Sequence, residues 1–282
     1  MAAAVLSPSV LVTGAGRGIG RAVALRMAGR GWQVHAGVRR EEDGAALQEA
    51  ATGTLHPVML DVADADQVAA LPDAVGGRLD AVVNNAGIVV SGPVEAVSAE
   101  DLRRQLEVNV VAQVSVTQAV LPLLRATGGR VVFVGSISGR VASPFLGAYS
   151  ASKFALEAIA DALRMELRPW DIRVVLVEPG SIDTDLWRGA LDTADAVEAS
   201  MSREHRTLYR RQIASMRKTV ARIQRQTSPV DKVADTIEIA LTTGRPRARY
   251  LVGTDARVRL AFQAALPTRA VDAAVSRMTT GR

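Results

Sequence analysis

Short apolar runs rich in valine alternate along this chain with longer stretches whose apolar residues recur at helical spacing. The runs are too apolar to form strands with one face in water, so both faces of the resulting sheet must be covered. Strand and helix in alternation predict an α/β fold with a doubly wound parallel sheet. We expect seven strands, at residues 10–13, 33–38, 56–60, 80–83, 130–134, 173–177 and 249–252.

The segments between these runs have helical periodicity, and we expect helices at residues 21–30, 64–75, 100–124, 151–167 and 230–241. A chain of 282 residues with 48% hydrophobic and only 4% aromatic content suits a single domain over residues 1–282 with an aliphatic core. The alternation breaks once, at residues 185–228, which we interpret as a helical insertion. Residues 254–282 follow the last strand as a C-terminal extension.

Composition excludes several kinds of chemistry. The absence of cysteine rules out disulfides, thiolate catalysis and cysteine-ligated metals, and the three widely spaced histidines make us expect no metal site. The N-terminus lacks the basic and apolar regions of a signal peptide. No segment approaches the ~20 uninterrupted apolar residues of a membrane-spanning helix. We therefore expect a soluble, cytoplasmic protein.

The first expected strand runs into a glycine-rich loop, which is followed at once by a helical segment. The loop, residues 13–20, carries Gly14, Gly18 and Gly20 in the spacing Gly-x-x-x-Gly-x-Gly. Glycines allow a sharp turn and let bare backbone approach a pyrophosphate at a helix N-terminus. The spacing departs from the simple Gly-x-Gly-x-x-Gly fingerprint, and an ordinary strand-to-helix turn is the alternative. The position between strand and helix favours a dinucleotide site.

The end of the second expected strand indicates which dinucleotide binds. An NAD-binding unit presents an acidic residue roughly 20 residues past the glycine loop, where it binds the adenosine ribose. This chain instead has an apolar residue, Val38, followed by Arg39 and Arg40. Guanidinium groups from Arg39 and from Arg17 in the loop can bind a 2′-phosphate. We predict NADP(H) in preference to NAD(H); two unrelated arginines in an arginine-rich chain are the alternative.

Tyr149 and Lys153 lie four residues apart, and Ser136 precedes them by thirteen. A helix that begins near Tyr149 would place the phenol and the ammonium on one face. A nearby cation favours the phenolate, so we expect Lys153 to lower the pKa of Tyr149. The Ser136 hydroxyl could hold a carbonyl oxygen against the phenol. Taken alone, the spacing is more typical of an ordinary surface contact than of a catalytic site.

In order and spacing, these motifs resemble the short-chain dehydrogenase/reductase family in its single-domain form, which has a Rossmann fold. The resemblance covers residues 10–184. A shorter stretch at residues 249–256, with Leu266 and Pro267 beyond it, resembles the branch that contains retinol and hydroxysteroid dehydrogenases. The positions that carry the main resemblance are Thr13, Gly14, Gly18, Gly20, Asp61, Val62, Asn84, Asn85, Ala86, Gly87, Asn109, Ser136, Tyr149, Lys153, Pro179 and Gly180.

The resemblance implies a role for each position. Asp61, beside Val62, would bind the adenine amino group, and the backbone of Asn109 would hold a water molecule linked to Lys153. The segment after the sixth strand would position the nicotinamide carboxamide. The expected cofactor-binding residues are Gly14, Arg17, Gly18, Ile19, Gly20, Arg39, Asp61, Val62, Asn85, Ala86, Gly87, Tyr149, Lys153, Pro179, Gly180, Ile182 and Thr184.

The implied activity is hydride transfer. Tyr149 would protonate the carbonyl oxygen, Ser136 would donate a hydrogen bond to it, and Lys153 would bind the nicotinamide ribose. With Asn109, these form the expected catalytic set. The expected function is an NADP(H)-dependent oxidoreductase that acts on a lipophilic secondary alcohol, aldehyde or ketone. A sensor or scaffold that binds NADP(H) without turnover is the alternative.

Residues 202–226 contain eight basic residues and one acid, with apolar residues at near-helical spacing, which predicts an amphipathic helix. The family resemblance implies that this insertion covers the substrate. Its basic face is interpreted as solvated surface, with an anionic membrane surface or an acidic partner as alternatives. We expect no nucleic-acid binding, because aromatic residues are not interleaved with the arginines. The resemblance also implies a homodimer or homotetramer that packs through the helices at 100–124 and 151–167.

Overall fold

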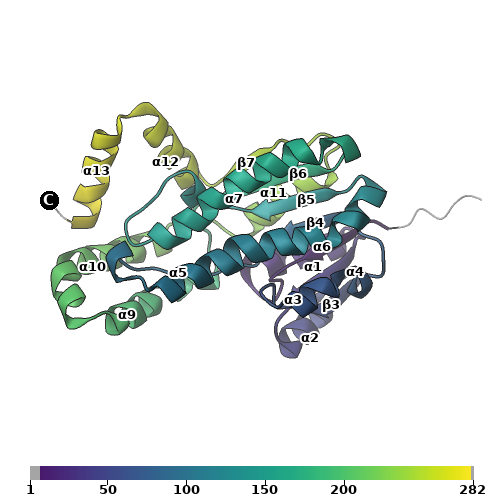
Figure 1. Cartoon of the computed structure of the whole chain (residues 1–282), viewed down its shortest axis with the longest axis horizontal. Coiled ribbons are helices and arrows are strands. Elements are labelled where there is room, and N and C mark those ends of the chain that lie inside the picture. The colour runs from purple at the N-terminus through teal and green to yellow at the C-terminus, as the bar shows by residue number, and fades with distance from the viewer. Residues whose placement is uncertain (1–6, 281–282) are drawn as a thin grey trace, which may run out of the picture.

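The computed structural model describes residues 7–280, so most of the N-terminal segment and the last two residues of the expected extension lie outside it. Seven parallel strands form one sheet in the order β3-β2-β1-β4-β5-β6-β7 (Figure 1), which confirms the predicted α/β fold. The chain moves outward from β1 to β3 and then returns to the other side of β1, so the strand order reverses between β1 and β4. Ligands bind beside such a reversal. The strands are β1 Ser9–Val12, β2 Gln33–Val38, β3 Leu55–Met59, β4 Ala81–Asn84, β5 Arg130–Val134, β6 Arg173–Pro179 and β7 Arg249–Val252.

Helices cover both faces of the sheet because successive strand residues point to opposite sides. Val10 and Val12 of β1 enter one apolar core, and Leu11 enters the other. The first core is completed by α1 Gly18–Gly29, α2 Glu41–Ala50 and α11 Asp231–Thr242. The second is completed by α3 Ala65–Ala69, α4 Leu71–Ala74, α6 Ala112–Thr127 and α7 Gly147–Glu166. The helix expected at residues 64–75 is two short helices, because Pro72 lies in the first turn of α4 and starts a new helix there.

A continuous helical run, Ala99–Thr127, is long and apolar enough to cross a membrane by length and composition alone. It consists of α5 Ala99–Leu106, a π-helical segment η2 Glu107–Val111, and α6. The inner face of α6, which includes Val116 and Val120, packs in the second core against the sheet. The core helix of a globular fold passes the same test, so this run is weak evidence for a membrane span.

The predicted insertion at residues 185–228 is helical: α8 Asp185–Arg188, α9 Ala190–Ser200 and α10 Arg203–Gln224. The C-terminal extension forms α12 Thr254–Ala265 and α13 Thr268–Thr280. Helix α13 packs along α10, so the extension and the insertion support each other. In Figure 1, α9, α10 and α13 gather at one end of the molecule, beside the start of α5.

Candidate active site

The glycine loop between β1 and α1 permits no side chain at its tightest point. A Cβ atom at Gly20 would lie 2.3 Å from the carbonyl oxygen of Gly14 and 2.5 Å from the side-chain nitrogen of Asn85. Gly14 and Gly18 have positive φ angles of 64° and 54°, which are costly for other residues. The loop therefore brings bare backbone to the N-terminus of α1, a twelve-residue helix whose first N–H groups can bind an anion.

A clamp of hydrogen bonds ties this loop to the segment after β4. The Thr13 hydroxyl accepts hydrogen bonds from the backbone N–H groups of Asn85 and Ala86, each at 3.0 Å. The Asn85 side chain donates to the carbonyl oxygens of Thr13 at 2.9 Å and Gly14 at 3.2 Å. Asn85 is therefore fixed beneath the glycine loop, and its side chain holds the backbone of this loop in place. Ile19 packs against the first core, which leaves its backbone for a ligand.

A pocket of about 550 Å³ opens at the carboxyl ends of β2 and β3, lined by Arg39, Met59, Asp61, Ala63, Asp64 and Gln67. Exposed Arg39 and the Asp61 carboxylate therefore share one cavity, as expected for an adenosine site. Val62 is buried in the second core, so only its backbone could contact a ligand there. Asp61 Oδ1 already accepts a hydrogen bond from Ala63 N at 3.0 Å, which orients the carboxylate.

The neighbouring arginines differ in the contacts that they make. Arg40 donates two hydrogen bonds to Asp43, at 2.9 and 2.7 Å. This hydrogen bonding lowers the pKa of Asp43, and the charges of Arg17 and Arg39 lower it further, so all three arginines lie around one carboxylate. Arg40 is occupied by a structural ion pair. Arg39 is exposed and lines the pocket, and Arg17 is exposed and lies near Asp43.

Asn109 lies in η2 and is fully buried. Its side-chain oxygen accepts from Ile88 N at 2.8 Å, while its nitrogen donates to Ile88 O at 3.0 Å and to the Ser152 hydroxyl at 3.2 Å. The Ser152 hydroxyl in turn donates to Tyr149 O at 2.7 Å. The π-helical turn, of a kind frequent at functional sites, places Asn109 between the segment after β4 and α7. The expectation for Asn109 concerned its backbone; the contacts found here are those of its side chain.

Ser136, Tyr149 and Lys153 come together where β5 ends and α7 begins. Ser136 follows β5 by two residues, and its hydroxyl accepts a hydrogen bond from Ser138 N at 3.0 Å. Lys153 is 5% exposed; its ammonium donates to Val134 O at 2.7 Å and lies 5.9 Å from the centre of the Tyr149 ring. Helix α7 begins at Gly147, two residues before Tyr149, so Tyr149 and Lys153 share one helical face as predicted.

The expected effect of Lys153 on Tyr149 is not found in this arrangement. Burial raises the pKa of Tyr149, and a hydrogen bond with Ser136 opposes the shift. Burial also lowers the pKa of Lys153 to about 8, because the charged ammonium is removed from water, while the charge of Glu157 opposes that change. Sequence spacing located the ammonium correctly, but it could not show that Lys153 is buried and Tyr149 half-buried.

The segment after β6 is held by a carboxylate that the sequence analysis did not single out. Ser181 N donates to Asp255 Oδ2 at 2.8 Å, and a Cβ atom at Gly180 would lie 2.4 Å from Asp255 Oδ1. Ile182 is buried in the first core, so only its backbone could face a ligand. A Cβ atom at Gly18 would lie 3.4 Å from the Thr184 methyl group, which places this segment across the glycine loop. The Gly-Thr-Asp sequence at the start of α12 was the available signal for Asp255.

The insertion contacts the site through an apolar cluster. Phe145, just before α7, packs with Met201 and Ile213, and a small cavity lies among these residues and Met216. Phe145 and Tyr209 meet edge to face with ring centres 6.4 Å apart. The Tyr209 hydroxyl donates to Glu95 at 2.6 Å, which ties α10 to the segment after β4. The apolar face of α10 is therefore turned toward the carboxyl end of the sheet.

Comparison with known proteins agrees with this geometry. The sequence model described as short chain dehydrogenase matches residues 8–195. The chain is 37% identical to the NADPH-dependent 3-dehydrocapnine reductase of Ornithobacterium rhinotracheale over 93% of this chain and 94% of that protein. It is 34% identical to mouse retinol dehydrogenase 5 over 95% and 87% of the two chains. A short chain dehydrogenase from Burkholderia cenocepacia, solved in complex with NADP, superimposes with a TM-score of 0.72 at 27% identity, covering 95% of this chain and 97% of that one.

The fold, the glycine loop and these relatives define a class of enzyme, the oxidoreductases that act on alcohol or carbonyl groups with a nicotinamide cofactor. The chain belongs to the short-chain dehydrogenase/reductase family. The relatives include retinol dehydrogenases, which confirms the branch that the C-terminal motif indicated.

Proposed function

We propose that this protein is an NADP(H)-dependent oxidoreductase that interconverts a lipophilic secondary alcohol, aldehyde or ketone by hydride transfer, with Ser136, Tyr149 and Lys153 as its acid/base set. The observation that carries the proposal is the meeting of these three side chains at the carboxyl end of β5, beside the glycine loop. When bound, the nicotinamide supplies or accepts the hydride. The protein's own side chains donate the proton and stabilise the charge on the substrate oxygen.

In the reducing direction, Tyr149 donates its proton to the carbonyl oxygen. Burial raises the pKa of Tyr149, so the phenol is protonated at neutral pH and ready to act as the acid. Ser136 donates a hydrogen bond to the same oxygen and stabilises the charge that develops on it. Lys153 contributes a positive charge beside the ring, which favours the phenolate once the proton has left.

NADP(H) is proposed as the preferred cofactor. The support is exposed Arg39, which lines the Asp61 pocket, and exposed Arg17 near Asp43, because guanidinium groups bind a 2′-phosphate through charge-assisted hydrogen bonds. A relative named as NADPH-dependent and a neighbour solved with NADP are consistent with this preference. Titration of the protein with each cofactor is the test. Comparable affinities for NAD and NADP would exclude the assignment.

A lipophilic substrate is proposed from the apolar cluster between α10 and the start of α7. Phe145, four residues before Tyr149 in the chain, packs there with Met201 and Ile213, and these side chains would offer an apolar surface to a bulky alcohol or carbonyl compound. The names of two relatives, a 3-dehydrocapnine reductase and a retinol dehydrogenase, support a carbonyl or alcohol substrate. NADPH oxidation measured over a panel of ketones and aldehydes of increasing apolar size would define the class.

The decisive variant is Tyr149→Phe, which removes the proton donor and keeps the ring. We expect NADPH affinity within about twofold of wild type and turnover reduced by about 10²-fold or more. Fluorescence titration of NADPH and steady-state rates measure the two quantities. Turnover retained by Tyr149→Phe would contradict the acid role.

A non-catalytic sensor is the rival function, favoured only if wild-type protein binds NADPH and turns over no member of a wide panel. The buried positions of Ser136 and Lys153 support the enzyme, because cofactor binding alone does not need an acid/base set. Wild-type turnover of any panel member would exclude the sensor.

Two further contacts are proposed for the whole molecule. Exposed apolar residues on the helical run 99–127 and on α7, among them Leu102, Val111 and Phe154, support a homodimer or homotetramer built on these helices. The exposed arginines of α10 support contact with an anionic membrane surface. Light scattering tests the first contact. Sedimentation with liposomes that contain or lack anionic lipid tests the second.

A further inference from the structure

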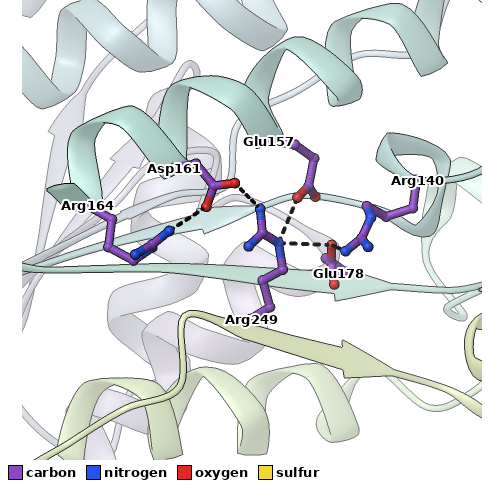
Figure 2. Close-up of polar contacts among 6 residues, drawn as sticks. All are labelled: Arg140, Glu157, Asp161, Arg164, Glu178 and Arg249. Atoms are coloured by element: carbon purple, nitrogen blue, oxygen red, sulfur yellow. Dashed lines mark hydrogen bonds and ion pairs between the residues drawn. The ribbon is translucent and has the colours of Figure 1, made fainter.

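A network of ion pairs around two buried carboxyl groups lies one helical turn beyond Lys153 and joins three elements (Figure 2). Glu157 projects from α7, Glu178 from β6 and Arg249 from β7. Arg249 donates to Glu157 Oε2 at 3.0 Å and to Asp161 at 2.6 Å, and it lies 3.8 Å from Glu178. Arg140 pairs with Glu178 at 3.3 Å, and Arg164 pairs with Asp161 at 3.0 Å. None of these residues belongs to the expected site.

Two carboxyl groups meet inside this network. Glu157 is 7% exposed and Glu178 is 2% exposed. Among residues 7–280, no N–H or hydroxyl donor reaches Glu157 Oε1, although this atom is buried. The carboxyl group of Glu178 lies beside the same guanidinium: Arg249 is 3.0 Å from Glu157 and 3.8 Å from Glu178, and two ionised carboxylates in one buried place repel each other. Glu157 and Glu178 therefore form a pair of like-charged groups, held between Arg249 and Arg140.

The position of Glu157 favours its protonated form. Burial raises the pKa of Glu157 to about 7; the neighbouring Glu178 adds to the effect, and Arg249 opposes it. Above neutral pH the pair carries a second negative charge. Below neutral pH it carries one, which the two neighbouring arginines offset. The net charge beside Lys153 thus changes close to neutral pH.

Glu157 is coupled to Lys153 by both position and charge. Tyr149, Lys153 and Glu157 follow one another at intervals of four residues along one face of α7. The Lys153 ammonium donates to Val134 O at 2.7 Å, and a Cβ atom at the next residue, Gly135, would lie 3.7 Å from Glu157 Oε1, so both charged groups lie against the end of β5. The pKa of Lys153 is lowered to about 8 by burial, and the charge of Glu157 raises it. An ionised Glu157 thus opposes loss of the ammonium above neutral pH.

We propose that Glu157 is a positioning residue whose ionised carboxylate, paired with Glu178, keeps Lys153 in the ammonium form at and above neutral pH. The inference rests on the proposed function for the catalytic consequence, but not for the titration itself. The charged groups that face Glu157 are Lys153 and Asp161 from α7, Glu178 from β6, Arg249 from β7 and, through Glu178, Arg140.

Lysine NMR tests the titration directly, because the chain contains only Lys153, Lys218 and Lys232. Protein labelled at lysine Cε gives three resonances, and Lys153→Arg assigns the one of interest. In Glu157→Gln we expect the Lys153 midpoint to fall by about half a unit to one unit, since a nearby negative charge is lost. In wild type the same resonance should show a second inflection near pH 7 as Glu157 titrates. The wild-type result keeps the test decisive if the variant does not fold.

Asp161→Asn is the matched control. It removes another carboxylate partner of Arg249 from the same helix, but two turns away from Lys153. Both variants are expected to lose stability, and only Glu157→Gln should move the Lys153 midpoint. An equal shift in both variants, an unchanged midpoint in Glu157→Gln, or a wild-type titration without the second inflection would overturn the proposal.

Activity gives the second readout. In Glu157→Gln, the alkaline limb of the pH profile of NADPH-dependent carbonyl reduction should move to lower pH by the same half to one unit. A shifted NMR midpoint with an unshifted profile would overturn the catalytic part of the inference. Failure of the proposed function has a different signature. Tyr149→Phe would then retain turnover, while the NMR titration of Lys153 in wild type and in Glu157→Gln would still give the results expected above.

Discussion

The two sides of the proposed site, a cofactor side at the glycine loop and a substrate side at the apolar cluster of α10, are built by different means. On the cofactor side, backbone meets backbone: Gly20 is closed in by Gly14, and the Thr13 hydroxyl fixes two N–H groups of the segment after β4. On the substrate side, apolar side chains such as Phe145, Met201 and Ile213 pack against one another. The first arrangement allows one residue type at its tightest positions. The second tolerates any set of side chains of similar volume.

The strained backbone of Phe145, on the substrate side, illustrates the same contrast. Phe145 has a φ angle of 65°, a conformation that costs a non-glycine residue roughly 1–3 kcal/mol. Its carbonyl oxygen accepts a hydrogen bond from Gly92 N at 2.8 Å, and its ring packs into the apolar cluster. Side-chain packing therefore compensates the strain that glycine avoids on the cofactor side.

The largest effect is expected for Gly20→Ala. The new methyl group would lie 2.3 Å from Gly14 O, inside van der Waals contact with rigid backbone. We expect NADPH affinity to fall about 100-fold, because overpacking of this kind costs roughly 1–3 kcal/mol or more and distorts the phosphate cradle. Fluorescence titration measures it. Gly244→Ala is the control, since nothing lies within 4 Å of its added methyl group.

This contrast also explains what could be predicted from sequence. The strands were located to within two residues, because valine-rich runs buried on both faces have a clear pattern, as at β5 and β6. Helix α2 was missed because only Gly44 and Leu47 are buried in it, which is too few for a visible period. The pairing of Glu157 with Glu178 and Arg249 joins three elements far apart in the chain. No local pattern contains such a contact.

The motif residues were brought together as expected, yet their electrostatics were not predictable. Lys153 lies against Tyr149, but burial raises the pKa of the phenol where the lysine charge alone suggested a decrease. Asp255 lies in a Gly-Thr-Asp sequence that offered a signal, but its contacts were not predictable, since its partners Gly180 and Ser181 are more than 70 positions away. Spacing indicates which groups meet. Burial, which decides their charge, depends on the whole fold.

A smaller effect is expected at the edge of the cofactor side, where Arg39 is exposed. In Arg39→Ala we expect NADPH affinity to fall about 10-fold to 30-fold and NADH affinity to stay unchanged, because only NADPH offers a 2′-phosphate to a charge-assisted hydrogen bond. Titrations with both cofactors measure the selectivity. Arg40→Ala is the matched control: its guanidinium is engaged by Asp43, so its removal should leave selectivity near wild type. An equal loss for both cofactors in Arg39→Ala would refute the phosphate role.

The smallest effect is expected on the substrate side, at Met216 on α10. Met216→Ala enlarges the small cavity beside Phe145 and Met201 without touching the glycine loop. We expect NADPH affinity to remain unchanged and the ratio of kcat/KM values for a bulky over a compact ketone to rise about threefold to tenfold, in the range set by one or two methylene groups in an apolar pocket. Leu208→Ala on the same helix is the control, because Leu208 is 58% exposed and lines no part of this cavity. If Met216→Ala weakened NADPH as strongly as Arg39→Ala, the two sides would be one coupled unit, and the separation of chemistry from specificity would fail.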